Sequence, residues 1–561
     1  MPLVVRCMVN RGLTGKEEMS EYLYGTRENL HSPNRMRDME KALAVLDEAK
    51  NNGKKVAIAS DFDCDGIFSA YILWRAFGAL GMDAKIYTPD RVKEGYGLNR
   101  RIIEEALKDR RSVLVTCDNG IAANEEVACA REKGMAVIVT DHHEVQDMPE
   151  ADAVLDPKRE DDAYPFAGLC GAGVAFKLID ALYEKYGIAE KEKWLLLPYV
   201  AIATVADVME LRGENRILVR EGLRMLQDVD NPGIQALLEI QGLKRKEITA
   251  GHIGFIIGPC FNAAGRISTV EDSFRLLMET DRDMAFSRAG HLKEINESRR
   301  EMTDEGAERA FALVEEKRAG ENLPPVLVVL LPDVHESLVG IIAGRLKERY
   351  HHPAIVFTEV EEDCVKGSGR SIEAYDMFSG LMACRELMLR FGGHKMAAGM
   401  TIRKQDLAEL ERRLCRDAGL TDEDFCPVVR IDAAMPIGFV TETLLEELAR
   451  MEPFGVGNPK PVFAEQHFKV LRGWRLGREN TVLKLRVENE KGSQCDALLF
   501  HGADDFDAFV REEWGQAELS RMYEGRENHL DVALTYYPEV NEYGGRRTLQ
   551  IQIIGYCRVG R

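Results

Sequence analysis

The sequence has no long apolar run. Its longest strongly apolar stretch, Val326 to Leu331, is far shorter than the roughly 20 residues that a membrane-spanning helix needs. The first residues, MPLVVRCMVNRGLTG, lack the apolar core and small-residue cleavage site of a signal peptide. We therefore expect no membrane segment and a cytoplasmic protein.

The sequence also lacks paired cysteines and an excess of basic charge. Its 12 cysteines contain no C-x-x-C pair, which argues against a zinc cluster or a disulfide framework and predicts reduced thiols. Lysine and arginine number 74 against 94 aspartates and glutamates, a net charge of −20. Taken alone, this charge argues against a nucleic-acid partner, because phosphate binding depends on basic residues.

The length of 561 residues allows three or four domains, and 45% hydrophobic residues are enough for folded cores. Short Val- and Ile-rich runs at 54–60, 112–116, 136–140 and 152–155 are separated by helical stretches, a pattern typical of a parallel α/β sheet. These runs are followed by Asp61, Asp118, Asp141 and Asp156. Ligand sites in such sheets form at the carboxyl ends of the strands.

The rest of the chain predicts further domains. Residues 281–318 are polar, free of proline and spaced for one long helix, and a second α/β unit begins after the ENLPP segment at 321–325. Five strand-like runs after Pro427, with an NEYGG turn, predict a small OB-type β-barrel. The expected divisions are a helical cap (1–50), an α/β catalytic domain (51–225), a helical connector (226–322), a second α/β domain (323–425) and the barrel (428–561).

The motif DFDCDG supplies Asp61, Asp63 and Asp65 directly after the first strand. A calcium-binding EF-hand loop would need an acidic twelfth residue, but this position is Ile72, and a strand precedes the motif. With Asp118 and the sequence Asp141-His142-His143, at least four carboxylates and two imidazoles reach one sheet edge. Each motif alone is often a surface turn, but so much like charge together requires cations.

Carboxylates with one or two imidazoles suit Mn²⁺, with Mg²⁺ as an alternative. A carboxylate that bridges two ions fits two-metal hydrolysis of a phosphoester. The sequence therefore favours two Mn²⁺ ions.

The motifs DFDCDG, TCDNGI, TDHHE, ATVADVMEL and GPCFNAAGRI, in this order, resemble the DHH phosphoesterases. The later motifs HESLVGIIAGR, GSGRSI, FGGHKMAAGM and PFGVGNPKPVF, followed by a barrel, resemble the bacterial single-strand-specific exonucleases of this superfamily. The resemblance implies an α/β fold with a parallel-sheet DHH domain, a second smaller α/β domain joined by the long helix, and a C-terminal OB-type barrel.

The resemblance also implies the roles of individual residues. The expected metal ligands are Asp61, Asp63, Asp65, Asp118, His142 and Asp207. The catalytic set comprises these residues except Asp61, together with His143 and His394. The expected contacts to the substrate and its 5′ phosphate are Arg91, Asn262, Arg266, Ser368, Arg370, Gly392, Gly393 and His394.

The substrate residues in the second domain lie in glycine-rich segments, GSGRS and GGHK, which we interpret as phosphate-binding loops. The same domain concentrates basic residues, so a basic groove on an acidic protein is compatible with the net charge. Several positions depart from the family pattern. Cys260 and Phe261 stand where relatives commonly have Arg and an aliphatic residue, and Ser60 and Ser337 replace common glycines.

The activity that the resemblance implies is a metal-dependent 5′→3′ exonuclease that releases nucleoside 5′-monophosphates from 5′-phosphorylated single-stranded DNA in recombination and repair. Single-strand-binding protein and a helicase are the implied partners. One alternative is a DHH phosphodiesterase for short RNA or cyclic dinucleotides, although such relatives lack the barrel. Another is a non-catalytic DNA-binding scaffold, although every expected metal ligand is present here. Trp474, Tyr536 and Tyr537 are candidates for stacking on bases, or else barrel core.

Overall fold

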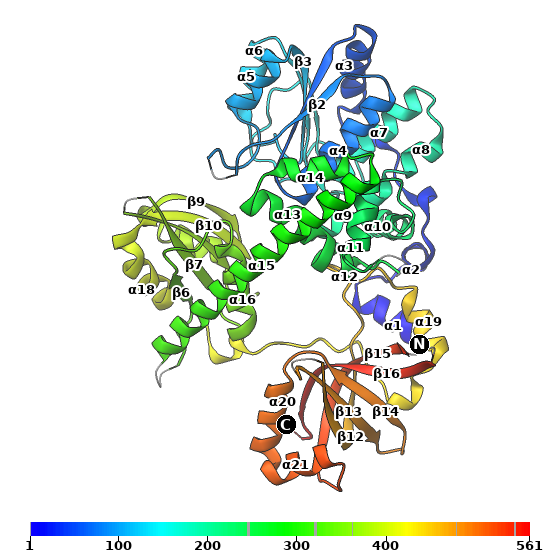
Figure 1. Cartoon of the computed structure of the whole chain (residues 1–561), viewed down its shortest axis with the longest axis vertical. Coiled ribbons are helices and arrows are strands. Elements are labelled where there is room, and N and C mark those ends of the chain that lie inside the picture. The colour runs from blue at the N-terminus through cyan, green and yellow to red at the C-terminus, as the bar shows by residue number, and fades with distance from the viewer. Residues whose placement is uncertain are drawn as a thin grey trace.

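The computed structural model describes residues 2–91, 93–243, 247–318, 322–361, 363–477, 480–543 and 546–560. Its three main bodies are an upper α/β body, a second α/β body beside the long helix, and a barrel at the other end of the molecule (Figure 1). No helix in the described ranges is both long and apolar enough to cross a membrane.

The first body is built on a five-stranded parallel sheet. The strand order is β2 (Ala84–Tyr87), β1 (Lys55–Ser60), β3 (Arg111–Cys117), β4 (Ala136–Thr140) and β5 (Ala153–Leu155). Alternate side chains of β1 enter separate cores, with Val56 and Ile58 on one face and Ala57 and Ala59 on the other. The predicted parallel sheet is confirmed, and β2 is a strand that the sequence analysis missed.

Helices cover both faces of this sheet. α3 (Met39–Asn51), α4 (Cys64–Ala79), α7 (Gly171–Lys185) and α9 (Leu197–Ala206) pack on one face, and α5 (Arg100–Lys108) and α6 (Asn124–Glu132) pack on the other. α7 and α9 are buried on nearly all sides, because they lie between the sheet and a further helical layer.

That layer contains α8 (Glu190–Trp194), α10 (Gly213–Leu226), α11 (Pro232–Ile240), α12 (Ala250–His252), a π-helical turn (Ile253–Ile257), α13 (Gly258–Ile267) and α14 (Val270–Leu277). It leads into α15 (Arg282–Arg318), 37 residues long, which confirms the predicted long helix. α15 runs diagonally from the upper body to the second one (Figure 1). Its early residues join the first core and its later residues, from Ala307 on, join the second body.

The second body has a mixed sheet, in the order β6 (Leu327–Leu330), β7 (Ala354–Glu361), β8 (Cys364–Arg370), β10 (Ala397–Arg403) and β9 (Met388–His394). Only β6 and β7 are parallel. α16 (Val339–Tyr350), α17 (Met377–Met382) and α18 (Leu407–Asp417) pack against it.

The phosphate-loop interpretation of GSGRS and GGHK is wrong in part. Gly367, Ser368, Gly369 and Arg370 lie in β8, and Gly392, Gly393 and His394 lie in β9. β10 pairs with both strands, so backbone groups of these segments contribute to a sheet ladder. The glycines misled the sequence analysis because glycine usually weakens a strand. Gly367 is required here because a side chain on it would meet the ring of Phe357 at 2.5 Å.

The C-terminal barrel closes on itself and confirms the predicted OB type. Its strands are β12 (Phe463–Leu476), β13 (Val482–Asn489), β14 (Gln494–Leu499), β16 (Arg546–Arg558) and β15 (Asp531–Tyr543), and β15 pairs back with β12. A short β11 (Ala433–Ala434) adds to β12, α19 (Glu442–Ala449) precedes the barrel, and α20 (Ala503–Trp514) and α21 (Gln516–Glu524) interrupt it. Gly544 and Gly545 of the predicted turn lie outside the described residues.

The structure differs from the expected N-terminal cap in its first 24 residues. α1 (Leu3–Asn10) and α2 (Lys16–Tyr24) place Val4, Cys7, Met8 and Tyr22 in the barrel core, and the N-terminus lies beside the barrel (Figure 1). From Leu30 onwards this region packs on the core of the first body, and Met36 and α3 are buried in it. The sequence predicts a helical, amphipathic segment, but it does not show against which core that segment packs.

Candidate metal centre

Three turns after β1, β3 and β4 deliver the candidate ligands to one edge of the parallel sheet. Asp61 follows β1 and is buried. Asp63 caps the N-terminus of α4, and its side chain accepts a hydrogen bond from the Gly66 amide at 3.0 Å. Asp65, in the first turn of α4, is also buried and accepts hydrogen bonds from the amides of Gly171 and Ala172 at 2.6 and 2.8 Å.

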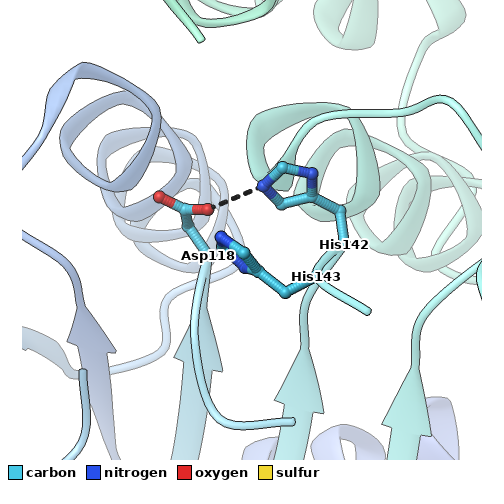
Figure 2. A group of neighbouring side chains, drawn as sticks. All are labelled: Asp118, His142 and His143. Atoms are coloured by element: carbon cyan, nitrogen blue, oxygen red, sulfur yellow. Dashed lines mark hydrogen bonds and ion pairs between the residues drawn. The ribbon is translucent and has the colours of Figure 1, made fainter. Parts of the chain in front are cut away.

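His142 lies among three of these carboxylates. Its Nε2 is 3.0 Å from Oδ1 of Asp118, 3.6 Å from Oδ2 of Asp65 and 3.7 Å from Oδ2 of Asp207. Figure 2 shows the Asp118 carboxylate facing the His142 ring above the ends of the strands. Asp118 has a left-handed backbone with a φ of 59°, a conformation that aspartate tolerates better than most residues.

Asp141 orients the turn that follows β4. Its Oδ1 accepts hydrogen bonds from the amides of His142 and His143, at 2.7 and 3.2 Å, and lies 2.7 Å from Nδ1 of His143. Its Oδ2 accepts a hydrogen bond from the amide of Ile121, in the segment after β3. The other side of the His143 ring contacts Tyr96, whose hydroxyl donates to the Asp118 carbonyl at 2.7 Å. Asp141 therefore ties the turn after β4 to the turn after β3.

Asp207 ends α9 and reaches the same site from outside the sheet. No strand end positions it, so the sequence pattern could not have placed it without the family motif. Gly171, at the start of α7, was missed entirely. A side chain there would meet Cβ of Asp118 at 2.7 Å and Oδ2 of Asp65 at 3.0 Å. The GLCGAG run in the sequence was the available signal for this close approach.

Asp156 ends the last strand, as expected, but is not in any of the ligand groups that the described residues form. It is fully buried, and burial raises the pKa of its carboxyl to about 7.

Burial and mutual repulsion dominate the electrostatics of the cluster. Burial, then the Asp63 carboxylate, raises the pKa of Asp65 to about 6, and burial, then Asp65, raises the pKa of Asp207 to about 8. The pKa values of Asp61 and Asp118 are raised well above their usual range for the same reasons. Burial lowers the pKa of His142 to about 3, which favours the neutral ring that binds metals.

These donors fit divalent cations. Ligand atoms lie within 4.8 Å of one another in three overlapping groups: Asp61, Asp63 and Asp118; Asp65, His142 and Asp207; and Asp118, His142 and His143. Among the described residues, the ion pairs of Asp65, Asp118 and Asp207 involve only His142. Oδ1 of Asp61 is buried with no hydrogen-bond partner in the same part of the chain. Oxygen-rich sites with one or two imidazoles suit Mn²⁺ and Mg²⁺.

Several of the expected substrate cations lie beside this cluster. The guanidinium of Arg91 is 4.5 Å from the centre of the Phe62 ring and interacts with Asp61 and Asp63. Arg266 donates to the Ser337 carbonyl at 2.8 Å, which joins α13 to the second body. Burial, then Arg91, lowers the pKa of Arg266 to about 10.

Arg370 is the third of these cations. Its Nη1 donates to Ser368 Oγ at 2.9 Å, and its positive charge contributes to lowering the pKa of Arg266. Nη2 of Arg370 and Oγ of Ser368 both lie 2.9 Å from where a side chain on Gly340 would begin. In the described part of the chain, no ion pair of Arg91, Arg266 or Arg370 with a carboxylate is within 4.0 Å. The three cations are therefore available to an anion.

The remaining predicted residues have other contacts. Asn262 accepts a hydrogen bond from the Cys64 amide at 2.9 Å and so holds the DFDCDG turn. Cys260 is fully buried and faces Gln241 and Asn296. His394 lies at the exposed end of β9 and accepts from the Met396 amide. No hydrogen bond or ion pair in the described ranges joins His394, Gly392 or Gly393 to the carboxylates.

Comparison with family models gives three matches. The DHH family N-terminal domain matches residues 55–204, the DHHA1 domain matches 323–417, and the RecJ OB domain matches 431–555. Together they cover both α/β bodies and the barrel.

Curated relatives and solved structures agree. The chain is 34% identical over 556 residues to the single-stranded-DNA-specific exonuclease RecJ of Bacillus subtilis, covering 98% of this chain and 67% of that protein. It is 33% identical to the protein of the same name in Dickeya dadantii, covering 98% and 95%. The crystal structure of RecJ with Mn²⁺ from Thermus thermophilus superposes with a TM-score of 0.80 at 27% identity, over 100% of this chain and 76% of that one.

Proposed function

Because this chain belongs to the RecJ family of single-stranded-DNA-specific exonucleases, we propose that it removes nucleoside 5′-monophosphates from the 5′ end of single-stranded DNA by metal-dependent hydrolysis. The observation that carries the proposal is the convergence of the carboxylates and imidazole beside one sheet edge, with Arg91 and Arg266 close to them. These ligand residues are Asp61, Asp63, Asp65, Asp118, His142 and Asp207.

We propose that these six residues would hold two Mn²⁺ ions, with Mg²⁺ as an alternative. Asp118 and His142 support this because each belongs to two of the three ligand groups. Bound divalent ions would lower the pKa of a water and neutralise charge on the scissile phosphate.

The chain's own groups prepare this site. Amides at the start of α7 fix the Asp65 carboxylate, and Asp141 fixes the backbone of the His142 turn. His143 Nδ1 faces Asp141, and its Nε2 lies 3.4 Å from the Tyr96 hydroxyl. We propose that His143 and His394 serve catalysis by contacting the phosphate and its leaving oxygen rather than by binding metal.

The 5′→3′ direction of digestion would follow from the arginines near the metal centre. We propose that Arg91, Arg266, Arg370 and Ser368 bind the terminal 5′ phosphate, and that Asn262, Gly392 and Gly393 shape the same passage. Guanidinium groups suit this because they bind phosphate oxygens in pairs. A terminal monoester carries more charge than a diester, so a site with several cations favours a 5′-phosphorylated end. Residues 51–225 would carry out the hydrolysis. Residues 323–425 would bind the 5′ end of the DNA, and residues 428–561 would guide the incoming strand.

Single-strand-binding protein and a helicase are proposed partners, because the substrate must be unwound and is otherwise covered, and the proposed setting is recombination and repair. The alternative of a cyclic-dinucleotide or short-RNA phosphodiesterase keeps the metal centre but leaves the barrel without a role. A non-catalytic scaffold would leave the buried, mutually repelling carboxylates unexplained.

The test is digestion of a 3′-labelled, 5′-phosphorylated oligonucleotide with Mn²⁺, beside blunt duplex, a cyclic dinucleotide and a chelator control. We expect stepwise shortening of the single strand alone, with mononucleotide products, stopped by the chelator. Hydrolysis of the cyclic dinucleotide alone, or binding without hydrolysis, would overturn the proposal in favour of one of the alternatives.

A further inference from the structure

Phe255 is the most exposed large apolar side chain in the described part of the chain, with 86% of its surface accessible. It lies in the π-helical turn Ile253–Ile257, between α12 and α13. π-helical turns are rare and are often found at functional sites. Its neighbours in the turn, Ile253 and Ile257, are fully buried, so the turn is held firmly while Phe255 projects outward.

Phe255 borders a groove of about 570 Å³ between the helical layer of the first body and the segment that leads to the barrel. One wall includes Leu223 and Ile248, and the other includes Phe454 and Lys460. We call this the Phe255 groove. An exposed aromatic side chain at the edge of a partly apolar groove is typical of a binding surface.

The π-helical turn that carries Phe255, and Gly258 directly after it, pack against α9, which ends at the metal centre. A side chain on Gly258 would lie 3.0 Å from Cβ of Ala206, and Asp207 is the next residue after Ala206. Val208, which follows, is 64% exposed and has a left-handed φ of 60°, a strained conformation for a β-branched residue. The residue directly after Asp207 therefore presents an apolar side chain to solvent.

The barrel side of the groove is joined to the same loop. The amide of Leu211 donates to the Val456 carbonyl at 2.8 Å, and Arg212 donates to the Gly457 carbonyl at 2.6 Å. Val456 is itself 47% exposed. The loop after Asp207 and the loop that leads into the barrel are therefore in contact, and each carries an exposed valine.

The groove carries charges of both signs. Arg220, Arg224 and Lys460 line it, against Glu247 and Glu452, and Arg224 also pairs with Glu221 at 2.8 Å. Arg220 lies beside Arg224, and its Nε is buried without a hydrogen-bond partner among the described residues. The Nζ of Lys460 lies 5.0 Å from the Tyr537 ring and has no ion pair within 4.0 Å in the described ranges. Burial, then Glu247, raises the pKa of Glu452, so its charge is the more easily lost.

We propose that the Phe255 groove binds the single-stranded DNA on the 3′ side of the scissile bond, with a base stacked on Phe255 and backbone phosphates near Arg220 and Lys460. This inference rests on the proposed function and adds the path between the metal centre and the barrel. Aromatic side chains beside cations are the usual means of binding single strands without sequence preference. The strand would pass Val208, reach Phe255 and continue along residues 453–460.

The test compares Phe255→Ala with Phe286→Ala, a control at a 50% exposed phenylalanine on α15 that does not line the groove. Affinity and kcat/KM are measured on 5′-phosphorylated oligonucleotides from 2 to 20 nucleotides. We expect Phe255→Ala to match the wild type on the shortest substrates and to lose about 5-fold to about 150-fold in affinity beyond a threshold length. Phe255→Trp should restore the affinity for the longer oligonucleotides.

The length dependence separates this proposal from its alternatives. An equal loss of affinity in Phe255→Ala at every oligonucleotide length would indicate a damaged fold and overturn the stacking assignment. Wild-type affinity in Phe255→Ala at every length would overturn it as well. A loss in Phe286→Ala as large as in Phe255→Ala would also overturn it. Photocrosslinking of an oligonucleotide with 5-iodouracil placed beyond the threshold should label the 253–257 peptide in catalytically active wild-type protein. If the wild type hydrolyses no oligonucleotide, the proposed function fails instead.

Discussion

Nε2 of His142 lies 3.0 Å from Oδ1 of Asp118, although the two residues follow different strands and are 24 positions apart in the chain. The contact exists because β3 and β4 are parallel neighbours, so the turns after them meet. A neutral imidazole and a carboxylate at this distance share one cation readily.

Asp118→Asn should abolish hydrolysis and leave DNA binding nearly unchanged. Asparagine keeps the size of the side chain and tolerates the left-handed backbone, but it removes the charge between two ligand groups. We expect kcat to fall by at least about 100-fold, the scale of losing one strong electrostatic group. Asp333→Asn, an exposed control paired with Arg309, should keep full activity. Substantial turnover in Asp118→Asn would remove this residue from the metal centre.

Arg370→Ala should weaken the preference for 5′-phosphorylated over 5′-hydroxyl DNA. Burial lowers the pKa of Arg370, and no carboxylate in the described ranges forms an ion pair with it, so a bound phosphate would be its main counter-charge. Losing one charged hydrogen-bonding group predicts a drop of about 10-fold or more in the ratio of kcat/KM for the two ends. Arg416→Ala, an exposed control, should leave the ratio unchanged. An unchanged ratio in Arg370→Ala would contradict the assignment.

Removing metal should lower the stability of the first body. A cation that binds only the folded state adds about 2.7 kcal/mol at 100 times its dissociation constant, and here it would also relieve repulsion among buried carboxylates. We expect Mn²⁺ added to chelator-treated protein to raise its melting temperature, measured by calorimetry. Asp118→Asn should show a smaller rise. Equal rises in the two proteins would place the stabilising ion elsewhere.

Lys177→Met should destabilise the first body by about 3 to 5 kcal/mol. Lys177 is fully buried on α7 and donates to Oε1 of Glu214 at 2.7 Å. Glu214 also accepts from the Tyr164 hydroxyl and the His31 amide, so its charge would remain buried without a counter-charge. Denaturant unfolding should show the loss, and the pair Lys177→Met with Glu214→Gln should recover part of it. A double variant as unstable as the single one would show that the charge is not the cause.

Glu94→Gln should destabilise the loop that carries Arg91, with the full effect above about pH 4.5 and a declining effect between pH 4.5 and pH 2. A hydrogen bond from Arg101, at 2.5 Å, lowers the pKa of Glu94 to about 2. A depressed pKa means that the stabilisation is complete above the unfolded pKa and disappears as the pH falls through the folded one. We expect a difference in unfolding free energy of up to about 1 kcal/mol at pH 7 and none near pH 2.

The control for this effect is Glu104→Gln, an exposed substitution on α5. The difference in unfolding free energy between Glu104→Gln and the wild type should not change over the same pH range. A Glu94→Gln difference that is independent of pH would show that Arg101 does not stabilise the ionised form.

Strands buried on both faces, such as β1 and β3, could be predicted because they are continuous apolar runs, and their ends located Asp61, Asp118 and His142. β2 was missed because AKIY is short and half exposed at the sheet edge. The glycine-rich strands β8 and β9 were missed because local sequence does not show tertiary neighbours. One such neighbour is Phe357, whose ring leaves room only for glycine at position 367.

Asp207 and Gly171 show a second limit. Both act through tertiary packing, one at the end of α9 and one at the start of α7, and neither has a periodic signal of its own. Family motifs supplied Asp207, while Gly171 needed the structure. Trp474 stays a candidate for stacking, whereas Tyr536 is fully buried in the barrel core and cannot stack on a base without unfolding.

The packing of α1 and α2 into the barrel has a consequence for synthesis. Cys7 leaves the ribosome several hundred residues before Phe463, its companion in the same core. At roughly 5 to 20 residues per second, the apolar face of α1 waits for tens of seconds while both α/β bodies emerge and fold. The barrel is thus made after both α/β bodies and secures helices made before them, so α1, α2 and the barrel become native together.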